Sequence, residues 1–184
     1  MKERILLFVS SIAGYLYSIR NFFRKLHPVV ITLFLMLMVS VPVTLVMSIK
    51  NQGVNRENKK DIEDFFKENP VSAIAYDILV KTPVKEEFKY RGPVAIISLL
   101  KLIPFFKPII TFQNPLVWFL IIFPGIDWSQ SHAVPWATLI DSLLLGWLVF
   151  KIGGIRGWLA SLLVHELINL AVFIGFCVNH FLIK

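Results

Sequence analysis

The residues best suited to chemistry are two adjacent carboxylates, Glu86 and Glu87, and the guanidinium of Arg91 that follows them. Glu87 and Arg91 are four positions apart, so on a helix they share a face and are predicted to form an ion pair. Glu86 lies about 100° away around the same helix and points elsewhere. The pattern therefore predicts one carboxylate that is neutralised locally and one that is available as an acid or base. A solvated helix start, where acidic side chains interact favourably with the helix dipole, is the alternative interpretation.

Two further pairs of chemically capable side chains lie in apolar stretches: Trp128 with His132, and His165 with Asn169. The members of each pair are four positions apart and therefore share a helical face. In lipid, His165 and Asn169 must face protein or a water-filled cavity. Hydrogen bonding between helices is the alternative to catalysis for this pair. The zinc-protease pattern His-Glu-x-x-His is not met, because Asn169 stands in place of the second histidine.

Asp141 lies outside these pairs, in the middle of a predicted helix that begins at Pro135. An ionisable residue inside a membrane helix is by default a functional hypothesis. A polar contact with a neighbouring helix is the interpretation that we favour for it.

The composition indicates an integral membrane protein. Of the 184 residues, 56% are hydrophobic, whereas a soluble domain has about 45–50%. Residues 29–49 carry no charge and would span about 32 Å as a helix, enough for the core of a bilayer. The single cysteine, Cys177, excludes a disulfide framework and a cysteine metal cluster. The net charge of +7 comes mostly from basic residues at the ends of apolar segments, so lipid headgroups and membrane topology explain it better than nucleic acid.

Prolines, glycines and charged runs divide the first half of the chain. Residues 5–19 are predicted to be a short span or an interfacial helix, and residues 29–49 a full span. Residues 50–69 form the long polar stretch, with a short surface helix predicted over 61–68. Residues 71–80 are too few to cross a bilayer, so they are predicted to form a helical lead-in that packs on the bundle.

The second half of the chain is predicted to hold four helices. Thr82 is a possible cap for a helix that begins at Pro83, carries Glu86 near its start and ends near Leu102. Gly153 and Gly154 are predicted to form a tight turn between the last two helices. The other three helices are predicted over residues 112–131, 135–151 and 155–183.

The three motifs occur in a fixed order on three predicted helices: Glu-Glu-x-x-x-Arg, then aromatic-x-x-x-His, then His-x-x-x-Asn. In this order they resemble the CAAX protease and bacteriocin-processing family of intramembrane proteases, also called the Abi family. The resemblance covers about residues 80–175. The family more often has Phe where this chain has Trp128. Each motif is weak alone, and the three in order are specific.

The resemblance implies an intramembrane endopeptidase in an all-α, polytopic bundle of five or six transmembrane helices. Residues 1–82 would supply N-terminal membrane segments and a polar loop, and residues 83–184 the protease core. The implied roles are as follows: Glu86 and His132 activate water, His165 and Asn169 donate to the oxyanion, and Glu87, Arg91 and Trp128 orient the site.

The sequence leaves two alternatives for a cofactor. Glu86, His132 and His165 can supply three ligands of one catalytic zinc ion, with water as the fourth. The same residues also suffice for a metal-free glutamate mechanism, so no cofactor is required. The expected partners are the lipid bilayer and a peptide or protein substrate, which can itself be membrane-anchored, and nucleic acid is not expected. The expected location is the plasma membrane of a prokaryote, with several membrane crossings.

Two non-peptidase functions are the alternatives. One is a non-catalytic membrane scaffold or bacteriocin immunity protein of the same fold, which need not keep Glu86, His132, His165 and Asn169 together. The other is a small transporter or channel, because buried acids and histidines also mark ion paths.

Overall fold

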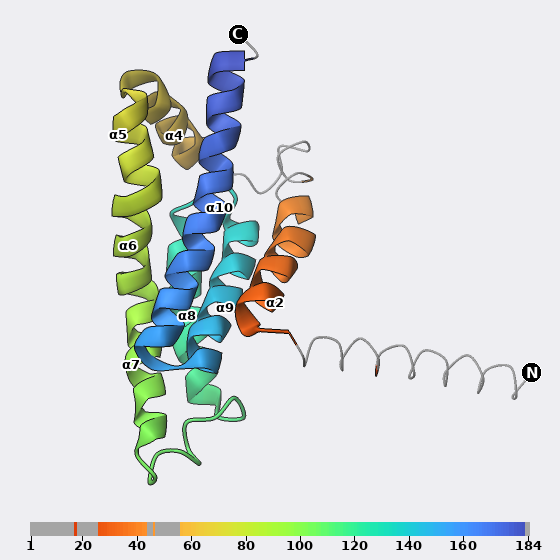
Figure 1. Ribbon diagram of the computed structural model, residues 1–184, viewed down its shortest axis with the longest axis vertical. Helices are drawn as coiled ribbons and strands as arrows, with labels where there is room; N and C mark the ends of the chain where they lie inside the picture. The colour runs from red at the N-terminus through yellow and green to blue at the C-terminus, as the bar shows by residue number, and fades with distance from the viewer. Residues whose placement is uncertain (1–16, 18–25, 44–45, 47–55, 183–184) are drawn as a thin grey trace, which may run out of the picture.

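The computed structural model describes residues 17, 26–43, 46 and 56–182 (Figure 1). Within this part of the chain all regular secondary structure is helical, which confirms the predicted all-α class. The predicted segment 5–19 lies outside the described residues, apart from Tyr17.

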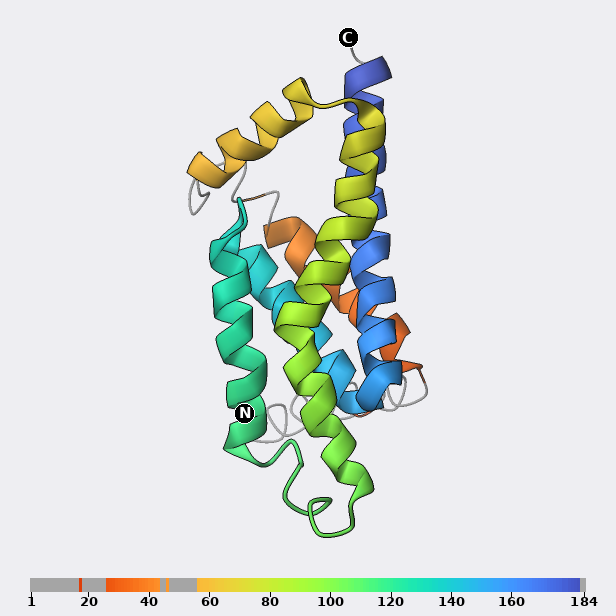
Figure 2. The same ribbon diagram turned by 90° about the vertical axis from the view of Figure 1, so that its left-hand side faces the viewer.

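The structure differs most from the predicted helices between Val71 and Leu102, where the chain forms one continuous helical column (Figures 1 and 2). Its consecutive parts are α5 (Val71–Tyr76), η2 (Asp77–Lys81), α6 (Thr82–Glu86), η3 (Glu87–Arg91), α7 (Gly92–Leu99) and η4 (Leu100–Leu102). Residues 71–80 are helical and pack against α10, as predicted, but they continue directly into the next helix. The predicted helix start at Pro83 is therefore wrong. The expected division at residues 82–83 coincides with no break in the described chain.

Two π-helical turns explain how this column passes through prolines. In η2 the Thr82 N–H donates to the Asp77 carbonyl, and in η3 the Gly92 N–H donates to the Glu87 carbonyl, five residues back in each case. Pro83 and Pro93 follow directly. A proline lacks an N–H, and its ring clashes with the carbonyl four residues earlier in a regular α-helix. A wider turn just before the proline relieves that clash, so the chain stays helical.

The remaining helices lie close to their predicted positions. The segment predicted over 61–68 is α4 (Arg56–Glu68), which begins earlier, and an apolar helix runs from Pro28 to Val43 as α2 (Pro28–Leu35), η1 (Met36–Ser40) and three further residues. The last three helices are α8 (Pro115–Gln130), α9 (Pro135–Ile152) and α10 (Gly154–Leu182). Gly153 and Gly154 form the predicted turn with φ of 87° and 55°, values that glycine adopts without strain.

Two helices of the described chain are long and apolar enough to cross a membrane: Pro135–Ile152 and Gly154–Ile174. Within the described residues the apolar helix Pro28–Val43 is shorter, and residues 44, 45 and 47–49 of the predicted span 29–49 lie outside them. Length and composition thus support membrane association of this part of the chain.

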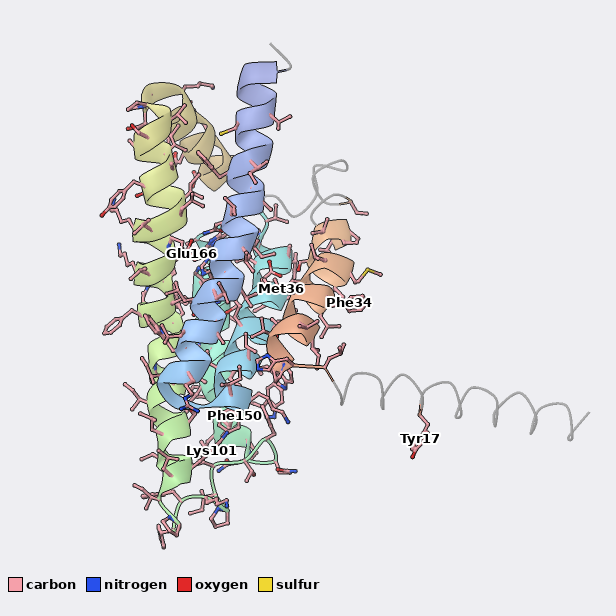
Figure 3. All side chains as sticks on the ribbon, viewed as in Figure 1. Tyr17, Phe34, Met36, Lys101, Phe150 and Glu166 are labelled. Carbon is pink, nitrogen blue, oxygen red and sulfur yellow. The ribbon has the colours of Figure 1, made fainter. Side chains whose placement is uncertain are left out.

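Helix α9 forms the centre of the bundle, with α8, α10, α7 and α2 packed around it (Figures 1 and 2). Leu145, Leu148 and Val149 of α9 are fully buried. Met36 points from η1 toward α9 and α10, whereas Phe34 of α2 points away from the bundle (Figure 3). The helix formed by α2 and η1 therefore shares one hydrophobic core with the helices that carry the candidate site.

Candidate active site

Three segments meet at the predicted site: the junction of α6 and η3, the turn directly after α8, and the middle of α10. They carry Glu86 and Glu87, His132, and His165, whose side chains lie within 3.8 Å of one another in successive pairs. The prediction that Glu86 lies near the start of its helix is wrong, because the column begins at Val71. Glu86 therefore contacts the histidines from the middle of the column's length and not from its first turn.

Glu87 and Arg91 form the predicted ion pair, with Arg91 Nε 3.7 Å from Glu87 Oε1. Both side chains are buried, with 0% and 1% exposure. The Arg91 guanidinium also donates from Nη2 to Ser142 Oγ at 3.2 Å, and its carbon lies 3.9 Å from the centroid of the Trp128 ring. These contacts tie the glutamate helix to α8 and α9.

Glu87 has a second partner that the sequence did not predict. His165 Nδ1 donates to Glu87 Oε1 at 3.1 Å, because the carboxylate can only accept. The buried carboxylate thus connects Arg91 to an imidazole of the site. This contact fixes which nitrogen of His165 carries a proton and orients the ring.

Glu86 lies between two imidazole nitrogens. Its Oε1 is 3.8 Å from His132 Nε2 and its Oε2 is 3.5 Å from His165 Nε2. His132 Nδ1 donates to the Trp128 carbonyl at 2.8 Å, so in both histidines Nδ1 is engaged elsewhere and Nε2 faces Glu86. Glu86 remains 16% exposed in its side chain, unlike Glu87. A carboxylate with two imidazoles and access to solvent can exchange protons.

Trp128 packs against both histidines. The centroid of its ring is 4.8 Å from that of His132 and 5.3 Å from that of His165, with near-perpendicular planes. The Arg91 guanidinium is a third group in contact with this ring. Trp128 is 4% exposed, so it acts as a rigid support on which both rings rest.

Asn169 lies one helical turn after His165 on α10 and makes a hydrogen bond to the backbone of η2. Its Nδ2 donates to the carbonyl oxygen of Ile78 at 3.1 Å. In the π turn η2 this carbonyl would accept from the residue five positions later, but that residue is Pro83, which has no N–H. Asn169 therefore satisfies a backbone acceptor that the proline leaves without its helical donor. This role was not predicted from the sequence.

A cavity of about 320 Å³ opens beside the site. His132, His165 and Asn169 line it on one side, together with Trp128. Met36, Ser40, Val41, Thr138, Asp141, Leu145, Ile168 and Val172 complete the lining. The cavity therefore brings His132, His165 and Asn169 next to η1 and α9, whereas Glu86 contacts the two histidines without lining the cavity itself.

Asp141 makes the interhelical polar contact that the sequence predicts, since the hydroxyl group of Ser40 in η1 donates to Asp141 Oδ1. Ser40 and Ser142, the partner of Arg91, were both missed by sequence reasoning. The available signal was a small polar residue within an apolar helix, which in lipid favours contact with another helix.

Zinc is one of the two alternatives that the sequence leaves open. Its candidate ligands Glu86, His132 and His165 all lie here, and they are the donor types of a catalytic zinc site. As placed they contact one another, and among the described residues no group of three or more His, Cys, Asp or Glu side chains is arranged to hold a metal ion. Zinc binding stays a prediction that chelation can test.

The loss of the buried Arg91 charge should destabilise the protein more than it changes the chemistry. We expect Arg91→Ala to lower the free energy of unfolding by about 3–5 kcal/mol, because Glu87 would be left as an unpaired buried charge. Thermal unfolding in detergent measures this. Lys81→Ala is the matched control, since Lys81 pairs with Asp77 across the same spacing at 3.0 Å but is 64% exposed, and such pairs contribute about 1 kcal/mol at most. An unchanged melting temperature with lost activity would instead assign Arg91 to substrate binding.

The site was also compared with known proteins. No family model, no curated protein and no solved structure matches the chain. The family resemblance therefore stays a prediction that rests on the seven motif residues: Glu86, Glu87, Arg91, Trp128, His132, His165 and Asn169.

Proposed function

We propose that this chain is an intramembrane endopeptidase of the CAAX protease and bacteriocin-processing type. The observation that carries the proposal is the position of Glu86, which is partly exposed between the Nε2 atoms of His132 and His165. Both histidines line a cavity that is large enough to admit part of a peptide. The arrangement supplies a base, an orienting imidazole and candidate donors to an oxyanion.

In the proposed reaction the Glu86 carboxylate removes a proton from a water molecule that His132 Nε2 helps to orient. The water oxygen bonds to the carbonyl carbon of the substrate peptide, and negative charge develops on the carbonyl oxygen. His165 takes part as an imidazolium, with Nδ1–H on Glu87 and Nε2–H donating to this oxygen, and the amide of Asn169 is the second donor. Collapse breaks the C–N bond, and the departing amine takes the proton from Glu86.

The other motif residues have positioning roles in this proposal. Glu87 holds His165 through Nδ1, Arg91 neutralises Glu87, and Trp128 supports both imidazole rings. If a zinc ion is held by Glu86, His132 and His165, it would supply Lewis-acid activation of the same water. The metal-free form is the one that we favour, because asparagine is a poor zinc ligand and Asn169 belongs to the motif.

The proposal places five or six helices across the plasma membrane of a prokaryote, with a peptide or membrane-anchored protein as the substrate. Purified protein in liposomes tests it against the transporter alternative. A peptidase releases a peptide fragment and conducts no ions, whereas a transporter or channel built on the same acids conducts ions and cleaves nothing. A scaffold or immunity protein would do neither.

The orientation in the membrane is predicted from charge. Lys101, Lys151 and Arg156 line one pocket where α9 ends and α10 begins. Helix α4 lies at the other end of the bundle (Figure 1). Because basic residues favour the cytoplasmic side, we expect the end with this pocket to face the cytoplasm. In a chain with Cys177→Ser, an impermeant thiol reagent applied to intact cells should label Glu68→Cys and leave Arg156→Cys unlabelled. The reverse pattern would invert the topology.

A further inference from the structure

Asp141 is an acid inside the bundle that the proposed hydrolysis does not use. It lies on α9 and lines the cavity together with His132 and His165. Its Oδ1 accepts from the Ser40 hydroxyl group. Among the described residues its Oδ2 makes no hydrogen bond, and the side chain, which lines the cavity, is only partly buried. One carboxylate oxygen of Asp141 thus accepts the Ser40 hydrogen bond, and the other can accept a hydrogen bond from a bound group.

The charges around the cavity are unequal. Three carboxylates lie at or beside it, those of Glu86, Glu87 and Asp141; Arg91 pairs with Glu87, and the imidazoles of His132 and His165 contact the two glutamates. The nearby Lys89 is 59% exposed and pairs with Asp127 at 3.2 Å instead. Asp141 has no Lys or Arg within ion-pair distance among the described side chains. Because an unpaired charge in a largely apolar interior is unfavourable, this surplus favours a positively charged guest.

Apart from Thr138, the rest of the cavity lining is apolar and is formed by Trp128, Met36, Val41, Leu145, Ile168 and Val172, while Asn169 and the two histidines belong to the proposed catalytic site. Lysine and arginine side chains combine a long apolar stem with a cationic end, and they pack the stem on apolar surface while the charge reaches a polar partner. A carboxylate in a cavity with an apolar wall matches both parts of such a side chain.

We propose that this cavity binds a lysine or arginine side chain of the peptide substrate, and that Asp141 is the residue that recognises its charge. This inference rests on the proposed function, because it defines the substrate class of the same site. Ser40 is a positioning residue, since its hydroxyl group fixes the Asp141 carboxylate from the neighbouring helix.

The test uses a pool of peptides that carry lysine, norleucine or glutamate at each position in turn. Norleucine keeps the stem of lysine and lacks the amine. We expect the wild-type protein to cleave the lysine peptides faster than the norleucine peptides at one position, by about 10- to 100-fold in kcat/KM, as for one hydrogen bond between charged groups. Asp141→Asn should remove this preference. Asp127→Asn, which removes an exposed acid that lies outside the cavity, should retain it.

Each other result overturns the inference. Wild-type protein without a lysine preference at any position excludes it, even if Asp141→Asn does not fold. A preference that survives Asp141→Asn also excludes it. An equal loss of cleavage for lysine and norleucine peptides in Asp141→Asn would assign the acid to proton transfer.

A binding measurement separates this inference from the proposed function. Glu86→Gln protein is incubated with the same pool, and the retained peptides are identified by mass spectrometry. If wild type cleaves no peptide but Glu86→Gln retains lysine over norleucine peptides in an Asp141-dependent manner, the peptidase proposal fails and the binding site stands. If peptides are cleaved without lysine selectivity in either assay, the binding inference fails and the peptidase stands. Neither cleavage nor lysine-selective retention would overturn both.

Discussion

Glu86→Gln is expected to lower the rate of peptide release by at least about 100-fold, the lower range for removal of a general base. Glutamine keeps the size of the side chain and its contacts with both histidines but cannot accept the proton of water. Because Glu86 is 16% exposed and makes no buried ion pair with Arg or Lys among the described residues, the variant should fold and remain monodisperse in detergent. Release of peptide fragments from a reconstituted sample, followed by mass spectrometry, is the measurement.

Glu166→Gln is the matched control for this experiment. Glu166 directly follows His165 but is only partly buried and takes no part in the cavity lining. Its neutralisation should leave peptide release unchanged. Near-normal release by Glu86→Gln would remove Glu86 from the mechanism, and a similar loss in both variants would point to a general effect of charge.

The second prediction with a large expected effect concerns His165 and Asn169, and it distinguishes oxyanion donors from zinc ligands. We expect His165→Ala and Asn169→Ala each to lower kcat by about 10²–10³ with little change in KM, because the contacts form mainly in the transition state. Activity should survive exhaustive chelation. Loss of activity on chelation, recovery on addition of zinc, and about one zinc per chain that is absent from His165→Ala would assign His165 to a metal instead.

Asn169→Ala needs a further control because Asn169 also donates a hydrogen bond to the Ile78 carbonyl. Its loss should lower the melting temperature as well as the turnover. Pro83→Ala restores an N–H five residues after Ile78, so the double variant Pro83→Ala with Asn169→Ala should recover stability. If turnover returns together with stability, Asn169 is a structural residue and its assignment as an oxyanion donor fails.

Helix positions could be predicted where a proline begins a helix in the usual way. Pro28, Pro115 and Pro135 all lie in the first turn of a helix, where the missing N–H has no cost. The same rule gave a wrong helix start at Pro83. Local sequence signals do not distinguish a proline that begins a helix from one that follows a π turn, because the hydrogen bonds of the preceding turn decide between the two.

Part of the candidate site could likewise be predicted from the sequence, and part of it could not. The pairing of Glu87 with Arg91 depends on spacing within one helix, so the sequence predicts it. The contact of Glu87 with His165 and that of Asp141 with Ser40 join residues that are 78 and 101 positions apart. Such contacts depend on how the helices are rotated and packed against each other, which no local spacing contains.

The two π turns of the long column also have a consequence for its helical phase. Ile74 and Ser98 are 24 positions apart, and in a regular α-helix this separation would place them about 240° apart around the axis. Each π turn takes up one additional residue, or about 100°. With η2 and η3 between them, the two side chains come within about 40° of the same direction, and both are buried, at 0% and 3% exposure. A periodicity analysis with a single repeat of 3.6 would divide this helix into segments of different phase, whereas the two π turns bring the buried Ile74 and Ser98 to the same side of the column.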